Sequence, residues 1–150
     1  MQYGFITHPD DVPVRLARLE AEAGTGFDMQ HRRIQGGVVI HTRARVRPGD
    51  LVEVHTGLRN RPVSYRARVL WVIDRERPAV GLVFENEQQA FIARMTEQVC
   101  HIEQYRRNQA AQGRLLTESE AAREWIEQFS HDFPRIGPIV PTEHIRHSAA

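Results

Sequence analysis

Apolar and polar residues alternate along the first half of the chain with the two-residue period of half-buried β-strands. The run VPVRLARLE at 12–20 places Val12, Val14 and Leu16 on one side of a strand. Similar runs occupy residues 36–43, 51–55, 63–73 and 80–84. Because short turns separate these runs and no helical period interrupts them, the pattern predicts five or six strands in an antiparallel barrel or sandwich.

The clearest alternation lies in residues 63–73. Polar side chains occupy one face of this expected strand, with Ser64, Arg66 and Arg68 in alternate positions. The predicted core face consists of Val63, Tyr65, Ala67, Val69, Trp71 and Ile73. Since alternate side chains of a strand point to opposite faces, we expect all six to share the buried side of the sheet.

The apolar period changes to three or four residues after residue 86, which is typical of an amphipathic helix. We expect this helix over residues 87–108. Its apolar stripe consists of Phe91, Met95, Val99, Ile102 and Tyr105. We predict that the stripe covers the protein's own core, with pairing to a second molecule as the alternative.

A second helix is predicted from a capping box at Thr117 and Glu120, in which the hydroxyl and the carboxylate each satisfy a free backbone N–H. Its expected apolar face consists of Ala122, Trp125, Ile126 and Phe129. Pro134 is expected to end the helix, and residues 134–150 are predicted to be a flexible tail. The expected organisation is a barrel at 1–86, a helical extension at 87–133 and the tail.

The composition is typical of one folded, soluble domain, since 41% of the 150 residues are hydrophobic and 26% are charged. All 20 basic residues are arginine and 19 acids nearly balance them, so net charge predicts no polyanionic partner. The arginines are concentrated within residues 32–77. We interpret them as a solvated strand face, with a nucleic-acid-binding barrel as an alternative.

Candidate catalytic and metal-binding residues form no recognisable motif. The eight histidines belong to no CxxC or HExxH pattern, so we expect no metal centre, no catalytic constellation and no enzymatic activity. Cys100, the single cysteine, cannot form an internal disulfide. The sequence shows neither a signal-peptide pattern nor an apolar run of roughly 20 residues, so we expect a cytoplasmic protein without membrane insertion.

Four segments, taken in order, resemble the strands of the PilZ family of bacterial signalling domains. They are Gly36-Gly37-Val38-Val39-Ile40, Arg47-Pro48-Gly49-Asp50-Leu51-Val52-Glu53-Val54, Ala67-Arg68-Val69-Leu70-Trp71-Val72 and Val80-Gly81-Leu82-Val83-Phe84. The opening residues and the two helices resemble a subgroup with a two-helix C-terminal extension. The resemblance covers residues 1–134 and implies a six-stranded antiparallel barrel that receives cyclic di-GMP and passes the signal to a protein partner.

The first ligand motif of the family is altered in this sequence. PilZ domains hold cyclic di-GMP with an RxxxR motif before the first strand, because arginine binds phosphate and guanine edges bidentately. Alignment on His8-Pro9 places Tyr3 and Thr7 at the two arginine positions. Each lost charged hydrogen bond costs roughly 1.5–3 kcal/mol. Two such losses weaken binding by roughly a hundredfold or more.

The second ligand motif, (D/N)xSxxG, is also altered. Alignment on Gly36-Gly37 places Arg32 and Ile34 at the first polar position and the serine position, and only Gly37 matches. The degenerate candidate cleft therefore consists of Tyr3, Thr7, His8, His31, Arg32, Arg33, Gly36 and Gly37.

The resemblance leads to two main hypotheses. The favoured one is a non-enzymatic adaptor of the PilZ type, without a cofactor, which has weak or no affinity for cyclic di-GMP and acts on an unidentified protein. The alternative is a true cyclic di-GMP receptor whose altered site uses His31, Arg32 and Arg33 beside Gly37. The sequence identifies neither the partner protein nor the pathway, and a homo-oligomer is a further alternative.

Overall fold

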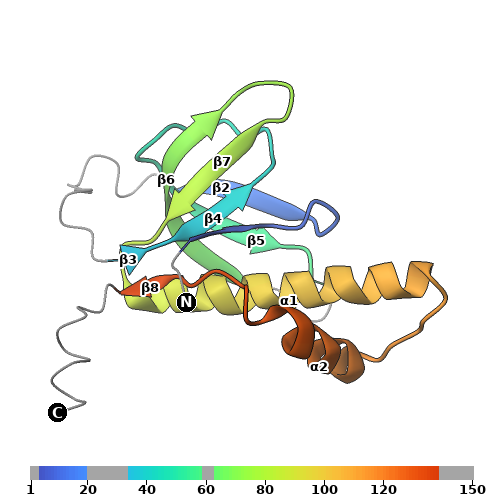
Figure 1. The fold of residues 1–150 in the computed structure, drawn as a ribbon. Helices are drawn as coiled ribbons and strands as arrows, with labels where there is room; N and C mark the ends of the chain where they lie inside the picture. The colour runs from blue at the N-terminus through green and yellow to red at the C-terminus, as the bar shows by residue number, and fades with distance from the viewer. Residues whose placement is uncertain (1–3, 20–33, 59–62, 139–150) are drawn as a thin grey trace, which may run out of the picture.

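The structure is a computed structural model that describes residues 4–19, 34–58 and 63–138 (Figure 1). Within these ranges the chain forms one large sheet, one small sheet and two helices. In chain order the elements are β1 Phe5–Thr7, β2 Val14–Leu19, β3 Ile34–Gln35, β4 Gly37–Ile40, β5 Leu51–Thr56, β6 Ser64–Ile73, β7 Ala79–Val83, α1 Glu87–Ala111, α2 Glu118–Phe129 and β8 Gly137–Pro138. The β-rich half followed by two helices confirms the coarse prediction.

The large sheet has six strands in the order β1-β4-β7-β6-β5-β2. All neighbouring strands are antiparallel except β1 and β4, which run parallel with Phe5 opposite Gly37 and Thr7 opposite Val39. The prediction of a closed antiparallel barrel is therefore wrong in two respects, because the sheet is mixed and its edge strands β1 and β2 do not pair. The short strand β1 was not predicted; it enters beside β4 in the same direction.

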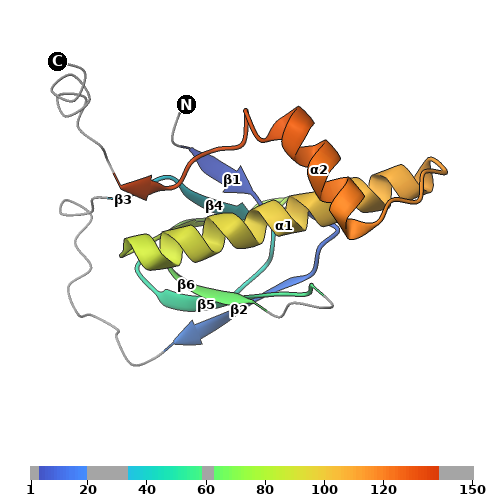
Figure 2. The same ribbon diagram turned by 90° about the horizontal axis from the view of Figure 1, so that it is seen from below.

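Helix α1 lies across one face of the curved sheet, with β1 and β4 on one side of it and β2, β5 and β6 on the other (Figure 2). It contributes buried residues at a spacing of three and four: Ala90, Ala93, Glu97 and Cys100. The small alanine side chains allow the helix to approach the sheet closely. The hydrophobic core consequently lies between the sheet and the alanine side of α1.

The predicted apolar stripe of the first helix is wrong at its amino-terminal end. Phe91 is 65% exposed and Met95 is 43% exposed, while Ile102 and Tyr105 pack partly against the core. Hydrophobicity alone predicts that the larger side chains are buried. Because α1 lies close to the sheet, the smaller alanine side chains are buried instead. The outward position of Phe91 leaves apolar surface in contact with solvent.

A β-bulge in β6 changes which side chains face the core. Tyr65, Ala67 and Val69 are buried as predicted. The register then shifts between Val69 and Trp71, so that Trp71 lies opposite Gly81. One extra residue in a strand moves every later side chain to the other face. The predicted core positions of Trp71 and Ile73 are therefore wrong.

Helix α2 begins as predicted. The Glu120 backbone N–H donates to the Thr117 hydroxyl at 3.1 Å, and the Thr117 N–H donates to the Glu120 carboxylate at 2.9 Å. Trp125 is buried against the core, whereas Ile126 and Phe129 remain about half exposed. The helix ends at Phe129, before the proline that was expected to end it.

The segment after α2 returns to the sheet. Phe133 and Ile136 are buried, and β8 pairs with β3 in the small sheet. The Gly4 backbone N–H donates to the Arg135 carbonyl at 3.2 Å. The first five residues of the segment predicted as a tail, 134–138, thus pack against the fold, and residues 139–150 lie outside the described chain.

Candidate functional site

Half of the predicted nucleotide cleft lies within the described chain. Tyr3, His31, Arg32 and Arg33 lie outside the described residues. Of the others, Thr7 is exposed at the end of β1, and its carbonyl oxygen lies 2.9 Å from His101 Nε2. His8, Gly36 and Gly37 complete the described part.

The parallel pairing of β1 with β4 brings the two ends of the predicted cleft beside each other, but it also covers the glycines. A side chain at Gly36, where φ is +87°, would meet the backbone oxygens of Gly4 and Arg135 at 2.7 Å. A side chain at Gly37 would meet the Phe5 ring at 2.7 Å. Both glycines therefore allow close approach of the protein's own segments.

His8 belongs to a buried polar cluster. Its Nδ1 lies 2.9 and 3.0 Å from the two carboxylate oxygens of Glu97, and its Nε2 donates to the Val12 carbonyl at 2.8 Å. The Tyr65 hydroxyl donates to Glu97 Oε2 at 3.2 Å. Donor atoms of His8, Glu97 and Cys100 all lie within 4.8 Å of one another. We call these three residues the His8 cluster.

The electrostatics of the cluster are dominated by burial and by the Glu97 carboxylate. Burial lowers the pKa of His8, but the hydrogen bond and the negative charge of Glu97 outweigh it, and the pKa is raised overall. Burial, together with Glu97, raises the pKa of the Tyr65 hydroxyl and of the Cys100 thiol well above their usual values. The phenol and the thiol are therefore neutral at physiological pH.

Sequence reasoning missed the His8 cluster as a unit. His8 was assigned to the nucleotide cleft, and Cys100 was considered as a candidate for a disulfide. His8 and Glu97 are separated by 89 residues, so no local motif joins them. The available signal was the three-residue spacing of Glu97 and Cys100, which places both on the alanine side of α1.

An open aromatic groove runs between α1, α2 and the segment that follows α2. Its volume is about 340 Å³, and its lining includes His101, Tyr105, Trp125, Phe129 and Phe133. The Tyr105 and Phe129 rings meet edge to face at 5.9 Å, and the Trp125 and Phe133 rings do so at 5.2 Å. These contacts hold the aromatic side chains in fixed positions around the groove, and we call this surface the helix groove.

Several arginines of the basic strand region pair with acids. Arg66 reaches Glu53 at 3.9 Å, and Arg43 reaches Asp74 at 3.4 Å. Arg68 binds Glu85 and also donates to the Gly49 carbonyl. Pairing of this kind reduces the positive potential that the sequence suggested for this part of the chain.

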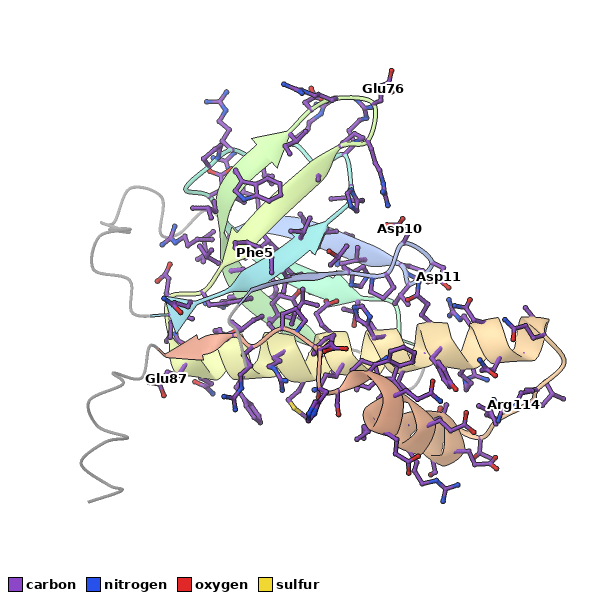
Figure 3. All side chains as sticks on the ribbon, in the orientation of Figure 1. Phe5, Asp10, Asp11, Glu76, Glu87 and Arg114 are labelled. Atoms are coloured by element: carbon purple, nitrogen blue, oxygen red, sulfur yellow. The ribbon has the colours of Figure 1, made fainter. Side chains whose placement is uncertain are left out.

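The loop after β1 is tied to the sheet and to α1 through acidic residues. Arg77 donates to Asp10 at 2.6 Å, and Gln104 donates to Asp11 at 3.3 Å. Asp10 and Asp11 project from the loop above the carboxy-terminal half of α1 (Figure 3). This loop carries His8 and Val12, so its attachment fixes two members of the buried polar network.

The fold is a mixed β-sheet with α1 across one face and α2 packed against α1 (Figure 2). No match was found among protein-family models, curated proteins or solved structures. Neither helix of the described chain is long and apolar enough to cross a membrane. The relationship to PilZ domains therefore stays a prediction from the sequence.

Proposed function

We propose that the chain is a non-catalytic adaptor of the PilZ type that acts through protein contacts and has weak or no affinity for cyclic di-GMP. The helix groove carries this proposal. Tyr105, Trp125 and Phe129 line an open space of about 340 Å³, and Phe129 is 44% exposed. Aromatic side chains in such positions supply much of the binding energy at protein interfaces, so an apolar segment of a partner protein fits this groove.

The described part of the nucleotide cleft supports weak affinity for cyclic di-GMP. The side chain of His8 is 2% exposed, and both of its ring nitrogens contact protein oxygens. Gly36 and Gly37 lie beneath the chain segments that carry Gly4 and Phe5. A ligand at these three residues would have to displace contacts within the protein.

The charge distribution supports a protein partner over a nucleic acid. Binding to a phosphate backbone depends on several free cations along one surface. Arg43, Arg66 and Arg77 instead lie within 4.0 Å of carboxylates. Each of these pairs would have to separate before the arginine could neutralise a phosphate.

Calorimetric titration with cyclic di-GMP tests the ligand half of the proposal. We expect no measurable heat and no shift in melting temperature at moderate salt, because the two arginine positions of the family motif are Tyr3 and Thr7. The matched variant is Arg32→Ala combined with Arg33→Ala. Micromolar or tighter binding that this variant abolishes would contradict the proposal and identify a receptor with a rearranged site.

Replacement of Phe129 by glutamate tests the partner half. Proteins that co-purify with the full chain from its source cells are compared by quantitative mass spectrometry for the wild type and the variant. Loss of a central aromatic contact weakens an interface by about 2 kcal/mol or more. We therefore expect about a thirtyfold weaker complex with the specific partner.

Arg123→Ala is the control for this experiment, because Arg123 is exposed on the same helix and does not line the helix groove. The specific partner should be recovered with this variant as with the wild type. If no co-purifying protein is lost with Phe129→Glu and retained with Arg123→Ala, the helix groove is not the interface and the proposal fails.

A further inference from the structure

The His8 cluster places three different metal-ligand types in one buried volume. His8 comes from the loop after β1, and Glu97 and Cys100 come from successive turns of α1. The exposed fraction is 2% for His8 and 0% for the other two residues. We infer that the His8 cluster is a Zn²⁺ site. This inference goes beyond the proposed function and does not depend on it.

The hydrogen bonds around the cluster orient the donors as in a metal site. A carbonyl oxygen can only accept, so His8 Nε2 must carry a proton to bond the Val12 carbonyl at 2.8 Å. In the neutral imidazole this leaves the Nδ1 lone pair facing the Glu97 carboxylate. Two lone pairs at 2.9 Å repel each other unless a cation lies between them, and that cation is either a proton or a metal ion.

A second partner orients the carboxylate. The Tyr65 hydroxyl donates to Glu97 Oε2 at 3.2 Å, while both carboxylate oxygens face His8 Nδ1 at 2.9 and 3.0 Å. Metal-binding histidines usually donate their other ring N–H to a backbone carbonyl or a carboxylate, and ligating carboxylates are themselves hydrogen-bonded. Val12 and Tyr65 fill these two roles in the cluster.

The separations are close to those of zinc ligands. Zn–N and Zn–O bonds of about 2.0–2.2 Å in a tetrahedral site separate the two ligand atoms by roughly 3.3 Å. The His8 Nδ1 and Glu97 oxygens are 2.9 and 3.0 Å apart, so the two side chains need to move only slightly to admit the ion. Cys100 Sγ lies within 4.8 Å of both donors.

The charges also fit a divalent ion. A carboxylate and a thiolate together carry two negative charges, which neutralise Zn²⁺ among side chains with almost no exposed surface. Binding releases the proton shared by His8 and Glu97 and the thiol proton of Cys100. The set of one nitrogen, one oxygen and one sulfur donor favours Zn²⁺ over Mg²⁺ or Ca²⁺, which prefer oxygen ligands alone.

The test is titration of the chelator-treated full chain with Co²⁺, followed by competition with Zn²⁺. Co²⁺ bound to a thiolate gives a charge-transfer absorption band, and the chain contains only one cysteine. We expect the band to saturate at one Co²⁺ per chain and to disappear when Zn²⁺ is added. We also expect Zn²⁺ to raise the melting temperature of the wild-type protein.

Three variants identify the ligands. Cys100→Ser should fold, because serine is smaller, and should lack the band. His8→Gln should weaken Co²⁺ binding at least tenfold, as loss of a ligand or its close support commonly does. His131→Gln is the control, because His131 is exposed after α2 and contributes no donor to the cluster, so the Co²⁺ affinity of this variant should match the wild type.

Two outcomes would overturn the inference. One is a folded, fully reduced wild-type protein that gives no thiolate band at millimolar Co²⁺. The other is a thiolate band that shows the same Co²⁺ affinity in the wild type, in His8→Gln and in Glu97→Gln. Cys100 would then bind Co²⁺ without the other two residues of the cluster. Because Glu97→Gln keeps the size of the buried side chain, it remains informative if the His8 variant does not fold.

Discussion

Replacement of His8 by alanine is expected to lower the free energy of unfolding by about 3–5 kcal/mol. His8 Nδ1 lies 2.9 Å from Glu97, whose side chain has no exposed surface. Without the imidazole the buried carboxylate keeps the Tyr65 hydroxyl but loses the closer of its two partners inside the protein. Urea unfolding at neutral pH in the presence of a chelator measures this loss without a contribution from bound metal.

A second histidine provides the control for this prediction. His55 lies 2.9 Å from Glu53, the same separation as in the buried pair, but both side chains are about one-third exposed. Water screens such a pair, so His55→Ala should cost no more than about 1 kcal/mol. If both variants lose the same free energy of unfolding, burial of Glu97 does not determine the cost of removing His8.

Replacement of Gly37 by alanine is expected to destabilise the protein by about 3 kcal/mol. A methyl group at this position would overlap the Leu82 carbonyl oxygen of β7 and the ring of Phe5 from β1. The Phe5 ring can rotate, but the carbonyl belongs to the neighbouring strand of the sheet. The methyl group therefore has to separate β4 from β7, and thermal unfolding will report the loss.

Gly4→Ala is the matched control on the same edge of the sheet. A methyl group at Gly4 would lie 3.6 Å from the Pro134 side chain, which is an ordinary contact distance. Its effect should stay within about 0.5 kcal/mol. A Gly37 variant as stable as the Gly4 variant would show that the sheet accommodates a side chain between β4 and β7.

The sequence predicts strands and helix starts well in this protein because those signals are local. The alternation in residues 51–55 matches β5, where Val52, Val54 and Thr56 are buried. The capping box at Thr117 needs only four consecutive residues, and it starts α2 as predicted. Each of these signals is contained within one element and does not depend on how the elements pack.

The errors arise where packing between elements decides the outcome. The bulge after Val69 depends on the pairing of β6 with β7, so the exchange of Trp71 for Val72 in the core is invisible in either strand alone. The approach of α1 to the sheet buries Ala90 and Ala93 in preference to Phe91. Hydrophobicity ranks these residues in the opposite order.

The candidate sites show the same limit. Short family motifs selected Thr7 and Gly37 as candidate residues, but their neighbours in space depend on the parallel pairing of β1 with β4. No turn motif in the sequence predicts this pairing. From the sequence, Glu97 is expected to be an ordinary polar residue of the helix, because no local signal shows that it is buried beside His8. Pairs of this kind are set by the tertiary fold, since a charged residue enters a core only when its partner is present.

The hydrogen bond from Gly4 to the Arg135 carbonyl joins the beginning and the end of the described chain. β1 also needs β4 beside it and His101 of α1 against the Thr7 carbonyl. During translation β1 therefore emerges well before the segment around Arg135, which supplies one of the contacts at this edge. Contacts over such long separations slow folding, so we expect this edge of the sheet to obtain its last contacts only after α2 has been synthesised.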